Sequence, residues 1–230
     1  MLSSDMAILF RDRIQAASML SSGIKSFVSK HNLENIVHRD SNDVIIMAIP
    51  NGGVVTADIV AFNLERTLDI LISAKIGAPF NSEFEIGAVT HDGEFFPNTI
   101  LIEKFEVPQQ YINYQISSEV EKILVRLEKL RGTSSYRLNN KTVILIDDGI
   151  STGLSMSTAA KWISSQNIRK LIIAAPFGPK NVIKKLKEFT DAIIVLNAPL
   201  ECEPVGEYYQ YFPEVSDRQV YKIMQKYKHN

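Results

Sequence analysis

One stretch decides the fold: Thr142-Val-Ile-Leu-Ile-Asp-Asp-Gly-Ile-Ser-Thr-Gly-Leu-Ser155. An apolar run at 143–146 ends in two adjacent acids, Asp147 and Asp148, and a turn of small and hydroxyl-bearing residues follows. A short run without polar alternation, closed by a turn and then a helical pattern, is typical of a strand covered on both faces of a parallel sheet. The stretch therefore predicts a buried strand that brings two carboxylates and a small-residue loop to one edge of a sheet.

The same unalternating pattern recurs in four more short runs, at 44–49, 68–72, 171–175 and 192–196. Helical patterns lie between the runs, at 54–64, 155–165 and 179–189. This β-α-β rhythm predicts an α/β fold with a doubly wound, mostly parallel sheet of five strands. Three further helices are expected: one whose apolar positions run from Phe10 to Phe27, one from about Pro108 to Arg131, and a last one after Ser216, a suitable N-cap.

We expect one domain over residues 1–230, with its core at about 40–196. The segment at about 76–106 is rich in Gly, Pro, Asn and acids and reads as a flexible loop or hairpin excursion, with short strands near 84–90 and 99–102. The segment at about 197–213 carries Pro199, Pro204, Gly206 and four aromatic residues, and we expect it to form a small C-terminal hood.

Composition narrows the class of protein. The chain has 230 residues and a formal net charge of −1, so it lacks the positive field that holds a nucleic-acid backbone. No apolar run approaches the roughly 18 residues that span a membrane, and the N-terminal residues lack the apolar block of a signal peptide. The single cysteine, Cys202, excludes an intramolecular disulfide and favours a reducing compartment. We expect a cytoplasmic protein without nucleic-acid or membrane partners.

The loop after the twin acids has the composition of an anion site, in Ser151, Thr152, Gly153, Leu154 and Ser155. Backbone N–H groups and the positive end of a helix dipole hold phosphate at a helix start, and small residues let the backbone approach it. The acids would repel a phosphate, so Asp147 and Asp148 should face a sugar or a metal ion. The alternative is an ordinary strand-to-helix turn in which an aspartate caps the helix.

A second glycine loop follows the run at 44–49, in Asn51, Gly52 and Gly53. Glycines allow unusual backbone angles and expose N–H groups that bind anions. Ligands of open α/β sheets bind where the strand order reverses. If the strands at 44–49 and 143–146 are neighbours, the two loops meet at one crevice; otherwise the second loop is a plain Asn-Gly turn.

The stretch at 143–155 resembles the signature of the type I phosphoribosyltransferases. Further motifs resemble a branch of that family known as predicted phosphoribosyltransferases, and the resemblance covers nearly the whole chain. These motifs are Phe10-Arg-Asp-Arg13, Pro50-Asn-Gly-Gly53, Lys75-Ile-Gly-Ala-Pro79, Asn81-Ser-Glu-Phe84, Ile86-Gly-Ala-Val89 and Val205-Gly-Glu-Tyr-Tyr209. We expect the strand order 2-1-3-4-5 for the five runs taken in chain order.

The resemblance implies a role for each candidate residue. Asp147 and Asp148 would contact the ribose hydroxyls of phosphoribosyl pyrophosphate, and residues 151–155 would hold its 5′-phosphate. The loop at 51–53 would bind pyrophosphate, with a cis peptide at Asn51-Gly52, and Lys75 would end the second strand as a further pyrophosphate contact or as a solvated lysine. Mg²⁺ would bridge the substrate, with Asp147 and Asp148 as further candidate ligands.

Other implications concern the acceptor and the assembly. Tyr208 and Tyr209 in the hood would stack a base or, as aromatics after a last strand often do, close the core. Residues 76–98 would form a lid, and the chain would form a homodimer. Purine-salvage members of the 6-oxopurine type carry an aspartate where Ser151 stands, so the acceptor is left open.

The function expected first is Mg²⁺-dependent transfer of a ribosyl-5-phosphate group from phosphoribosyl pyrophosphate to a nitrogenous acceptor. This branch usually carries arginines where Asn51 and Ala74 stand, and two lost cations favour a second reading: a catalytically weak regulatory protein that binds phosphoribosyl pyrophosphate or a nucleotide. A third reading, phosphoryl transfer through an aspartyl phosphate, fits the loop that directly follows the acids less well.

Overall fold

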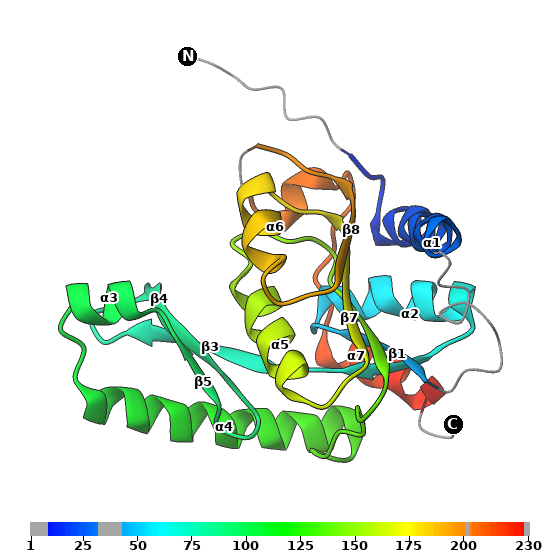
Figure 1. The fold of residues 1–230 in the computed structure, drawn as a ribbon. Helices are drawn as coiled ribbons and strands as arrows, with labels where there is room; N and C mark the ends of the chain where they lie inside the picture. Colours follow the sequence, from blue (N-terminus) through cyan, green and yellow to red (C-terminus); the bar gives the residue numbers. More distant parts are fainter. Residues whose placement is uncertain (1–8, 32–42, 201–202, 228–230) are drawn as a thin grey trace.

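A parallel sheet of five strands forms the centre of the fold in a computed structural model that describes residues 9–31, 43–200 and 203–227 (Figure 1). The strands run in the order β2-β1-β6-β7-β8, and each neighbouring pair is parallel. Their bounds are Thr67–Ile70 for β2, Val44–Ala48 for β1, Thr142–Ile146 for β6, Lys170–Phe177 for β7 and Ala192–Asn197 for β8. The predicted α/β class and the order 2-1-3-4-5 are both confirmed.

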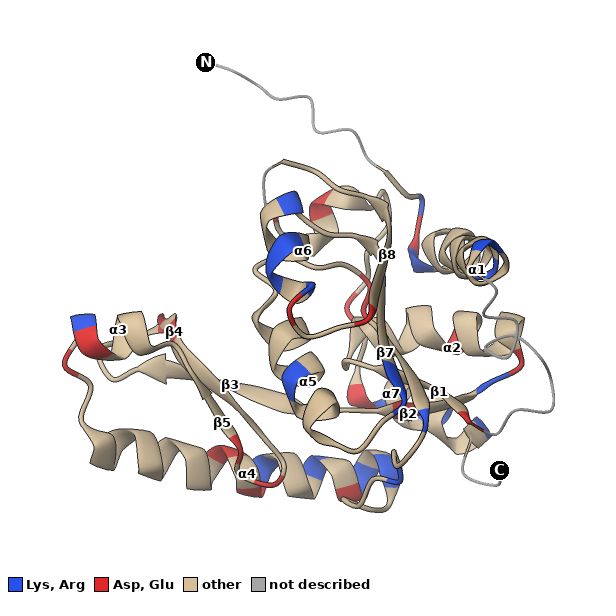
Figure 2. Ribbon diagram, viewed as in Figure 1, with Lys and Arg blue, Asp and Glu red and all other residues tan. Residues whose placement is uncertain are grey.

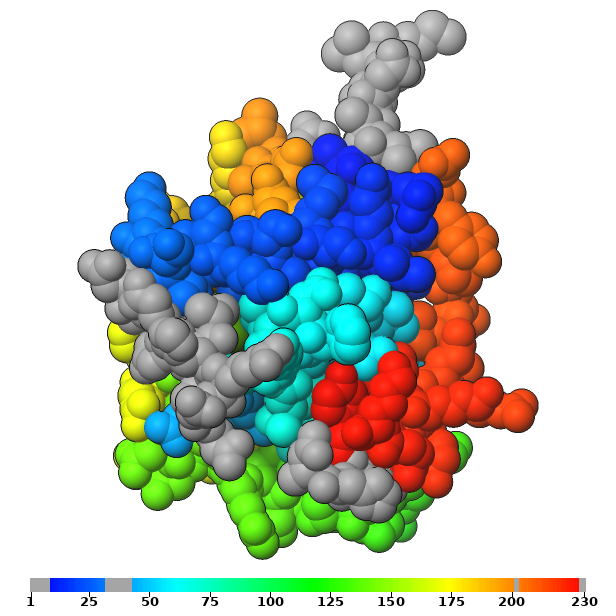
Figure 3. All heavy atoms as spheres, turned by 90° about the vertical axis from the view of Figure 1, so that its right-hand side faces the viewer, coloured from blue at the N-terminus to red at the C-terminus, as the bar shows by residue number. Residues whose placement is uncertain are grey.

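Helices cover both faces of this sheet, which is why most of its strands read as apolar runs; β2, with the sequence Thr-Leu-Asp-Ile, alternates instead. Helices α1 (Arg13–Lys30), α2 (Gly52–Leu64) and α7 (Asp217–Met224) gather on one face, where Figure 3 shows them side by side. Helices α5 (Leu154–Ser165) and α6 (Lys180–Leu186) cover the other face.

The strand β6 shows how side chains divide between the two layers. Ile144 and Ile146 belong to the core that contains residues of α1 and α2, whereas Val143 and Leu145 belong to the core that contains residues of α5 and α6. All five residues of β6 are buried. Because successive side chains of a strand point to opposite faces, β6 is fixed from both sides, and so is the position of the acids that follow it.

The segment predicted as an excursion forms a second, antiparallel sheet in the order β3-β4-β5. Its strands are β3 (Ser73–Ala78), β4 (Asn81–Thr90) and β5 (Phe95–Pro97). Figure 1 shows this sheet extending away from the parallel sheet with the long helix α4 (Gln109–Arg131) running along it. Residues 76–98 are therefore built from strands and tight turns rather than an irregular loop.

Two local expectations in this region are wrong. Residues 99–102, expected as a strand, begin helix α3 (Thr99–Lys104), because the side chain of Asn98 accepts from the backbone N–H of Leu101 and starts a helix. Lys75, expected at the end of the second strand, lies inside β3. The strand β2 ends at Ile70, but apolar residues continue to Ile72. Leu71 and Ile72 are buried where the chain passes from one sheet to the other.

Helix ends follow the capping residues of the sequence. The first helix begins at Arg13 rather than near Phe10, because Asp12 accepts a hydrogen bond from the backbone N–H of Gln15 at 2.8 Å. Ser216 caps α7 in a capping box with Gln219, as predicted. The described residues contain no helix long and apolar enough to cross a membrane. Cys202 lies outside the described residues.

An aromatic cluster joins the turn after β4 to helix α5. The carboxylate of Asp92 accepts a hydrogen bond from the indole N–H of Trp162 at 2.7 Å. The His91 ring meets the rings of Trp162 and Tyr136 edge-on, each at 4.9 Å between centroids. The Nδ1 atom of His91 is buried without a hydrogen-bond partner among the described residues. The antiparallel sheet is thus attached to the parallel core through a histidine whose surroundings favour its neutral form.

This histidine predicts acid sensitivity of folding. Burial lowers the pKa of His91 from its ordinary value of 6.5, outweighing the charge of Asp92, and Arg131 lowers it further. Because the folded-state pKa is depressed, the stabilisation is complete above pH 6.5 and is lost as the pH falls towards the folded-state pKa. We expect His91→Phe to reduce the drop in thermal midpoint between about pH 7.5 and about pH 5.5, measured by circular dichroism. Equal drops in the two chains would contradict this role.

Candidate functional site

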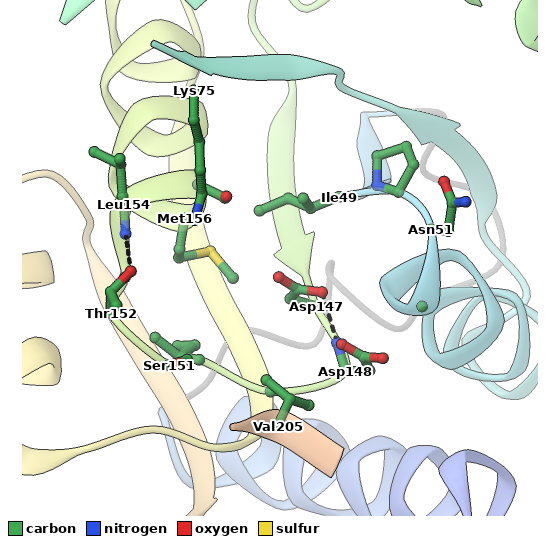
Figure 4. Close-up of a pocket in the computed structure, with 16 residues that line it drawn as sticks. Ile49, Asn51, Lys75, Asp147, Asp148, Ser151, Thr152, Leu154, Met156 and Val205 are labelled. Carbon is green, nitrogen blue, oxygen red and sulfur yellow. Dashed lines mark hydrogen bonds between the residues drawn. The ribbon is translucent and has the colours of Figure 1, made fainter. Parts of the chain in front are cut away.

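A cavity of about 260 Å³ opens at the carboxyl ends of β1 and β6 (Figure 4). It gathers most of the candidate residues from three parts of the chain: the loop after β1, strand β3 and the loop after β6. The predicted site residues that line it are Asn51, Gly52, Lys75, Asp147, Asp148, Ser151, Thr152, Gly153, Leu154 and Ser155. Gly53, Tyr208 and Tyr209 are the candidates that do not line it.

Asp147 is the acid that faces the cavity. It follows the last residue of β6, and its Oδ1 accepts a hydrogen bond from the backbone N–H of Asp148 at 2.9 Å. Burial raises the pKa of Asp147 well above its ordinary value, and the neighbouring charge of Asp148 raises it further. A carboxylate in this position gains most from a ligand that brings hydroxyl donors or a cation.

Asp148 is turned towards the protein interior, although it also borders the cavity. Its Oδ2 accepts a hydrogen bond from Nε of Arg13 at 2.7 Å, and the two side chains are only 10% and 7% exposed. Arg13 also donates to the carbonyl of Pro213 at 2.7 Å and lies 3.6 Å from the ring centre of Phe212. The hydroxyl of Tyr209 donates to the carbonyl of Asp148. The two acids, predicted to act alike, therefore have different surroundings.

The loop after the acids forms the start of helix α5, as predicted. Gly153 is the N-cap, with φ of 78°, and a Cβ there would lie 2.3 Å from Cγ1 of Val182. Only glycine fits this backbone without strain. Residues 151–155 at the start of α5 border the cavity, and the N–H of Leu154 donates to the hydroxyl of Thr152 at 3.5 Å. This arrangement suits an anion at the positive end of a helix dipole.

The two glycine loops meet directly at the acids. A Cβ on Gly52 would lie 1.9 Å from Oδ2 of Asp148, and a Cβ on Gly53 would lie 2.7 Å from Oδ1 of Asp147. Glycines are therefore required by close approach between the two loops. The cis peptide lies at Pro50-Asn51, one residue before the predicted position. Gly53 is in the first turn of α2, behind the surface of the cavity.

Lys75 extends towards the cavity from β3, where Figure 4 shows it. Its ammonium group pairs with Glu85 on the neighbouring strand β4. Lys75 is the only lysine or arginine among the described residues that line the cavity. The site thus combines two carboxylates with one cation, and Glu85 competes for that cation.

Two of the four aromatic residues of the hood, Tyr208 and Tyr209, are buried, whereas Tyr211 is exposed. Tyr208 and Tyr209 are 4% and 5% exposed, and the ring of Tyr208 lies 4.0 Å from that of Phe177. Burial raises the pKa of Tyr209 above its ordinary value, with a further contribution from the charge of Asp148. These rings offer no open face to a base, so they close the core, the second of the two roles expected for them. The hood residue that reaches the cavity is Val205.

Comparison with known proteins assigns the chain to a family. Residues 12–210 match the family model of the phosphoribosyl transferase domain. The chain belongs to this phosphoribosyl transferase family. It is similar to the crystal structure of TT1426 from Thermus thermophilus, with a TM-score of 0.75 and 28% identity over 95% of this chain and 98% of that one.

Two curated relatives come from Mycobacterium tuberculosis strains H37Rv and CDC 1551. They are named "Putative phosphoribosyl transferase Rv0571c" and "Putative phosphoribosyl transferase MT0597". Each is 27% identical to this chain over 184 residues, which is 80% of this chain and 42% of the relative. The chain therefore spans less than half the length of the curated relatives it matches.

The carboxylates at the cavity suit Mg²⁺ only if a bound substrate supplies further oxygen ligands. The described residues contain no group of three or more His, Cys, Asp or Glu side chains that could hold a metal ion. Asp147 supplies a carboxylate at the cavity surface, while Oδ2 of Asp148 is engaged by Arg13. Mg²⁺ binds oxygen ligands, often one or two carboxylates together with substrate phosphates. These residues are compatible with an ion held mainly by phosphate and sugar oxygens.

Proposed function

We propose that the chain transfers the ribosyl-5-phosphate group from phosphoribosyl pyrophosphate to a nitrogenous acceptor and releases pyrophosphate. The observation that supports this best is the meeting of two glycine loops and an acid at one cavity. One loop begins helix α5 and the other begins helix α2, so two helix starts border the cavity together with Asp147. Two helix starts at one cavity suit a substrate that carries a phosphate at one end and a pyrophosphate at the other.

In this proposal each loop holds one end of the substrate. The amides and hydroxyls at 151–155 bind the 5′-phosphate, and Asn51, Gly52 and Lys75 bind pyrophosphate. Asp147 accepts hydrogen bonds from the ribose hydroxyls and favours the positive charge that develops on the ribose ring. Asp148, held by Arg13, fixes the backbone that positions Asp147.

The reaction balances with these groups. A nitrogen lone pair of the acceptor forms a bond to C1 of the ribose, the bond from C1 to the pyrophosphate oxygen breaks, and its electron pair leaves with pyrophosphate. The acceptor nitrogen then releases its proton to water. Bound Mg²⁺ would neutralise charge on the leaving group. Lys75 and the loop N–H groups would do the same from the protein side, since donors aimed at developing charge lower the barrier.

A second candidate is a regulatory protein that binds phosphoribosyl pyrophosphate or a nucleotide without turnover. The pairing of Lys75 with Glu85 favours it, because the one lysine or arginine that lines the cavity in the described part of the chain is already engaged. Incubation with Mg²⁺, phosphoribosyl pyrophosphate and a panel of nitrogenous bases separates the two candidates. Pyrophosphate release with any acceptor supports the transferase; saturable binding without release supports the regulatory protein; absence of binding overturns both.

The lysine gives a prediction for binding. We expect Lys75→Gln to weaken the binding of phosphoribosyl pyrophosphate about tenfold, because the cavity loses its one lining cation, and a factor of ten corresponds to about 1.4 kcal/mol. Calorimetric titration in the presence of Mg²⁺ measures it. Glu85→Gln is the matched control, since it releases Lys75 from its partner and should tighten binding. Equal affinities for the parent chain, Lys75→Gln and Glu85→Gln would show that Lys75 does not contribute to binding.

A further inference from the structure

Arg126, on the C-terminal half of α4, reaches the loop that follows β1. Lysine and arginine residues alternate with glutamate residues on this part of the helix (Figure 2). Nη2 of Arg126 donates to the side-chain oxygen of Asn51. The same guanidinium also binds the carboxylate of Asp217, through Nη2 at 2.8 Å and Nε at 3.3 Å. One arginine therefore connects α4, the loop after β1 and the start of α7.

Asn51 is held on two sides by these contacts. Its Oδ1 accepts from Arg126, and its Nδ2 donates to the carbonyl of Val215 at 2.7 Å. Asn51 precedes α2, yet its side chain makes no capping hydrogen bond to that helix. The Asn51 side chain therefore connects the loop to Arg126 and to the carbonyl of Val215.

The loop separates two hollows. Pro50, Asn51 and Gly52 line the cavity of Figure 4 and also a second hollow of about 540 Å³, which Arg126 borders. Arg126 therefore borders the second hollow and is not among the residues that line the cavity. A cation in that place adds positive potential to the loop without entering the cavity, and its ion pair with Asp217 at 2.8 Å offsets part of that charge. Water screens it less than an exposed charge because its side chain is about two-thirds buried.

Binding of pyrophosphate at this cavity requires more positive charge than the residues that line it supply. The described lining of the cavity contains two aspartates and one lysine, and that lysine pairs with Glu85. A pyrophosphate group carries several negative charges, and the loop residues 50–53 contribute none of the opposite sign. Arg126 is bound to that loop through Asn51, and Nη2 of Arg13 lies 3.0 Å from where a Cβ on Gly52 would stand, although Arg13 is paired with Asp148.

We propose that Arg126 is a positioning residue of the pyrophosphate loop, which orients Asn51 and supplies positive charge to a loop that has none of its own. The inference rests on the proposed function, because it assumes that the loop binds pyrophosphate. Arg126 does not touch the substrate in this proposal; it acts through Asn51. A merely structural role would instead make Arg126 a tie between α4 and α7, with Asp217 as its equal partner.

Two variants that break the same ion pair distinguish these roles. Arg126→Gln removes the charge beside Asn51, whereas Asp217→Asn keeps that charge and removes its counter-charge. We expect Arg126→Gln to weaken the binding of Mg²⁺ and phosphoribosyl pyrophosphate about tenfold, and Asp217→Asn to leave it unchanged or tighter. Calorimetric titration gives the affinities, and thermal unfolding of each variant records the structural cost. Lys122→Gln, which removes an exposed charge from the same helix, should change neither quantity.

A third variant tests whether the charge itself matters. Asn51→Arg in the Arg126→Gln chain returns a cation to the loop and should recover most of the lost affinity. Equal weakening by Arg126→Gln and Asp217→Asn would overturn the proposal in favour of a structural tie, and so would an affinity unchanged by Arg126→Gln. If Arg126→Gln does not fold, Asp217→Asn decides alone, because weaker binding contradicts the proposal. A parent chain that does not bind the substrate overturns the proposed function itself, before any variant is compared.

Discussion

Replacing Asp147 with asparagine should lower kcat/KM for phosphoribosyl pyrophosphate about a hundredfold, a loss of about 2.7 kcal/mol of transition-state stabilisation. The carboxylate is the acid that faces the cavity, and its amide analogue cannot match its charge near the ribose ring. The fold should not suffer, because burial and the charge of Asp148 both raise the pKa of Asp147 and so disfavour its ionised form in the empty site. We expect the thermal midpoint to stay the same or to rise.

The measurement is the rate of pyrophosphate release at varied phosphoribosyl pyrophosphate and a fixed, saturating concentration of acceptor, paired with thermal unfolding of both chains. Asp92→Asn serves as a control, because Asp92 lies in the turn after β4 and binds Trp162 rather than the cavity. Full activity of Asp147→Asn would show that the carboxylate takes no part in the reaction. A lowered thermal midpoint would show that Asp147 has a structural role.

Asp148→Asn, unlike Asp147→Asn, should destabilise the fold. The expected loss in the free energy of unfolding is about 3 kcal/mol, because breaking a buried ion pair leaves an uncompensated charge. The pair with Arg13 is almost entirely buried, and Arg13 also binds the carbonyl of Pro213 and packs on Phe212. Removal of one charge therefore disturbs helix α1, the end of β6 and the hood together. The free energy of unfolding in urea, extrapolated to zero denaturant, measures the effect.

A double variant, Arg13→Met with Asp148→Asn, is the control for this second prediction. It removes both charges, so its loss of stability should be clearly smaller than the sum of the two single losses. If Asp148→Asn unfolds at the same urea concentration as the parent chain, the ion pair contributes nothing, and the carboxylate of Asp148 would be available to a ligand after all.

The parallel sheet could be predicted because a strand that is buried on both faces consists of a short run of apolar residues. Four of its five strands are largely apolar runs, β2 alternates between polar and apolar residues, and the order of the strands agrees with the resemblance to the phosphoribosyltransferases. The antiparallel sheet was harder to predict. Apolar residues continue from β2 to Ile72, and at 99–104 the capping side chain of Asn98 outweighs the strand-like composition. The division into core, excursion and hood stays a prediction.

The candidate site also has a part that could be predicted from the sequence and a part that could not. Asp147 and the loop at 151–155 follow one strand, so their proximity is local and can be read from spacing. Arg13 lies 135 residues from Asp148, and Arg126 lies 75 residues from Asn51. No local pattern marks those partners, although the motif Phe10-Arg-Asp-Arg13 drew attention to the first. The hood tyrosines could not be assigned either, because an aromatic that stacks a base and one that closes the core have the same sequence pattern.

A crystal structure of the chain with Mg²⁺ and phosphoribosyl pyrophosphate tests the central claim most directly. The expected result is a 5′-phosphate on the amides of residues 151–155, ribose hydroxyls at the carboxylate of Asp147, and pyrophosphate against Asn51 and Gly52. A cavity that stays empty at saturating substrate, or a substrate bound elsewhere on the chain, would contradict the proposed activity.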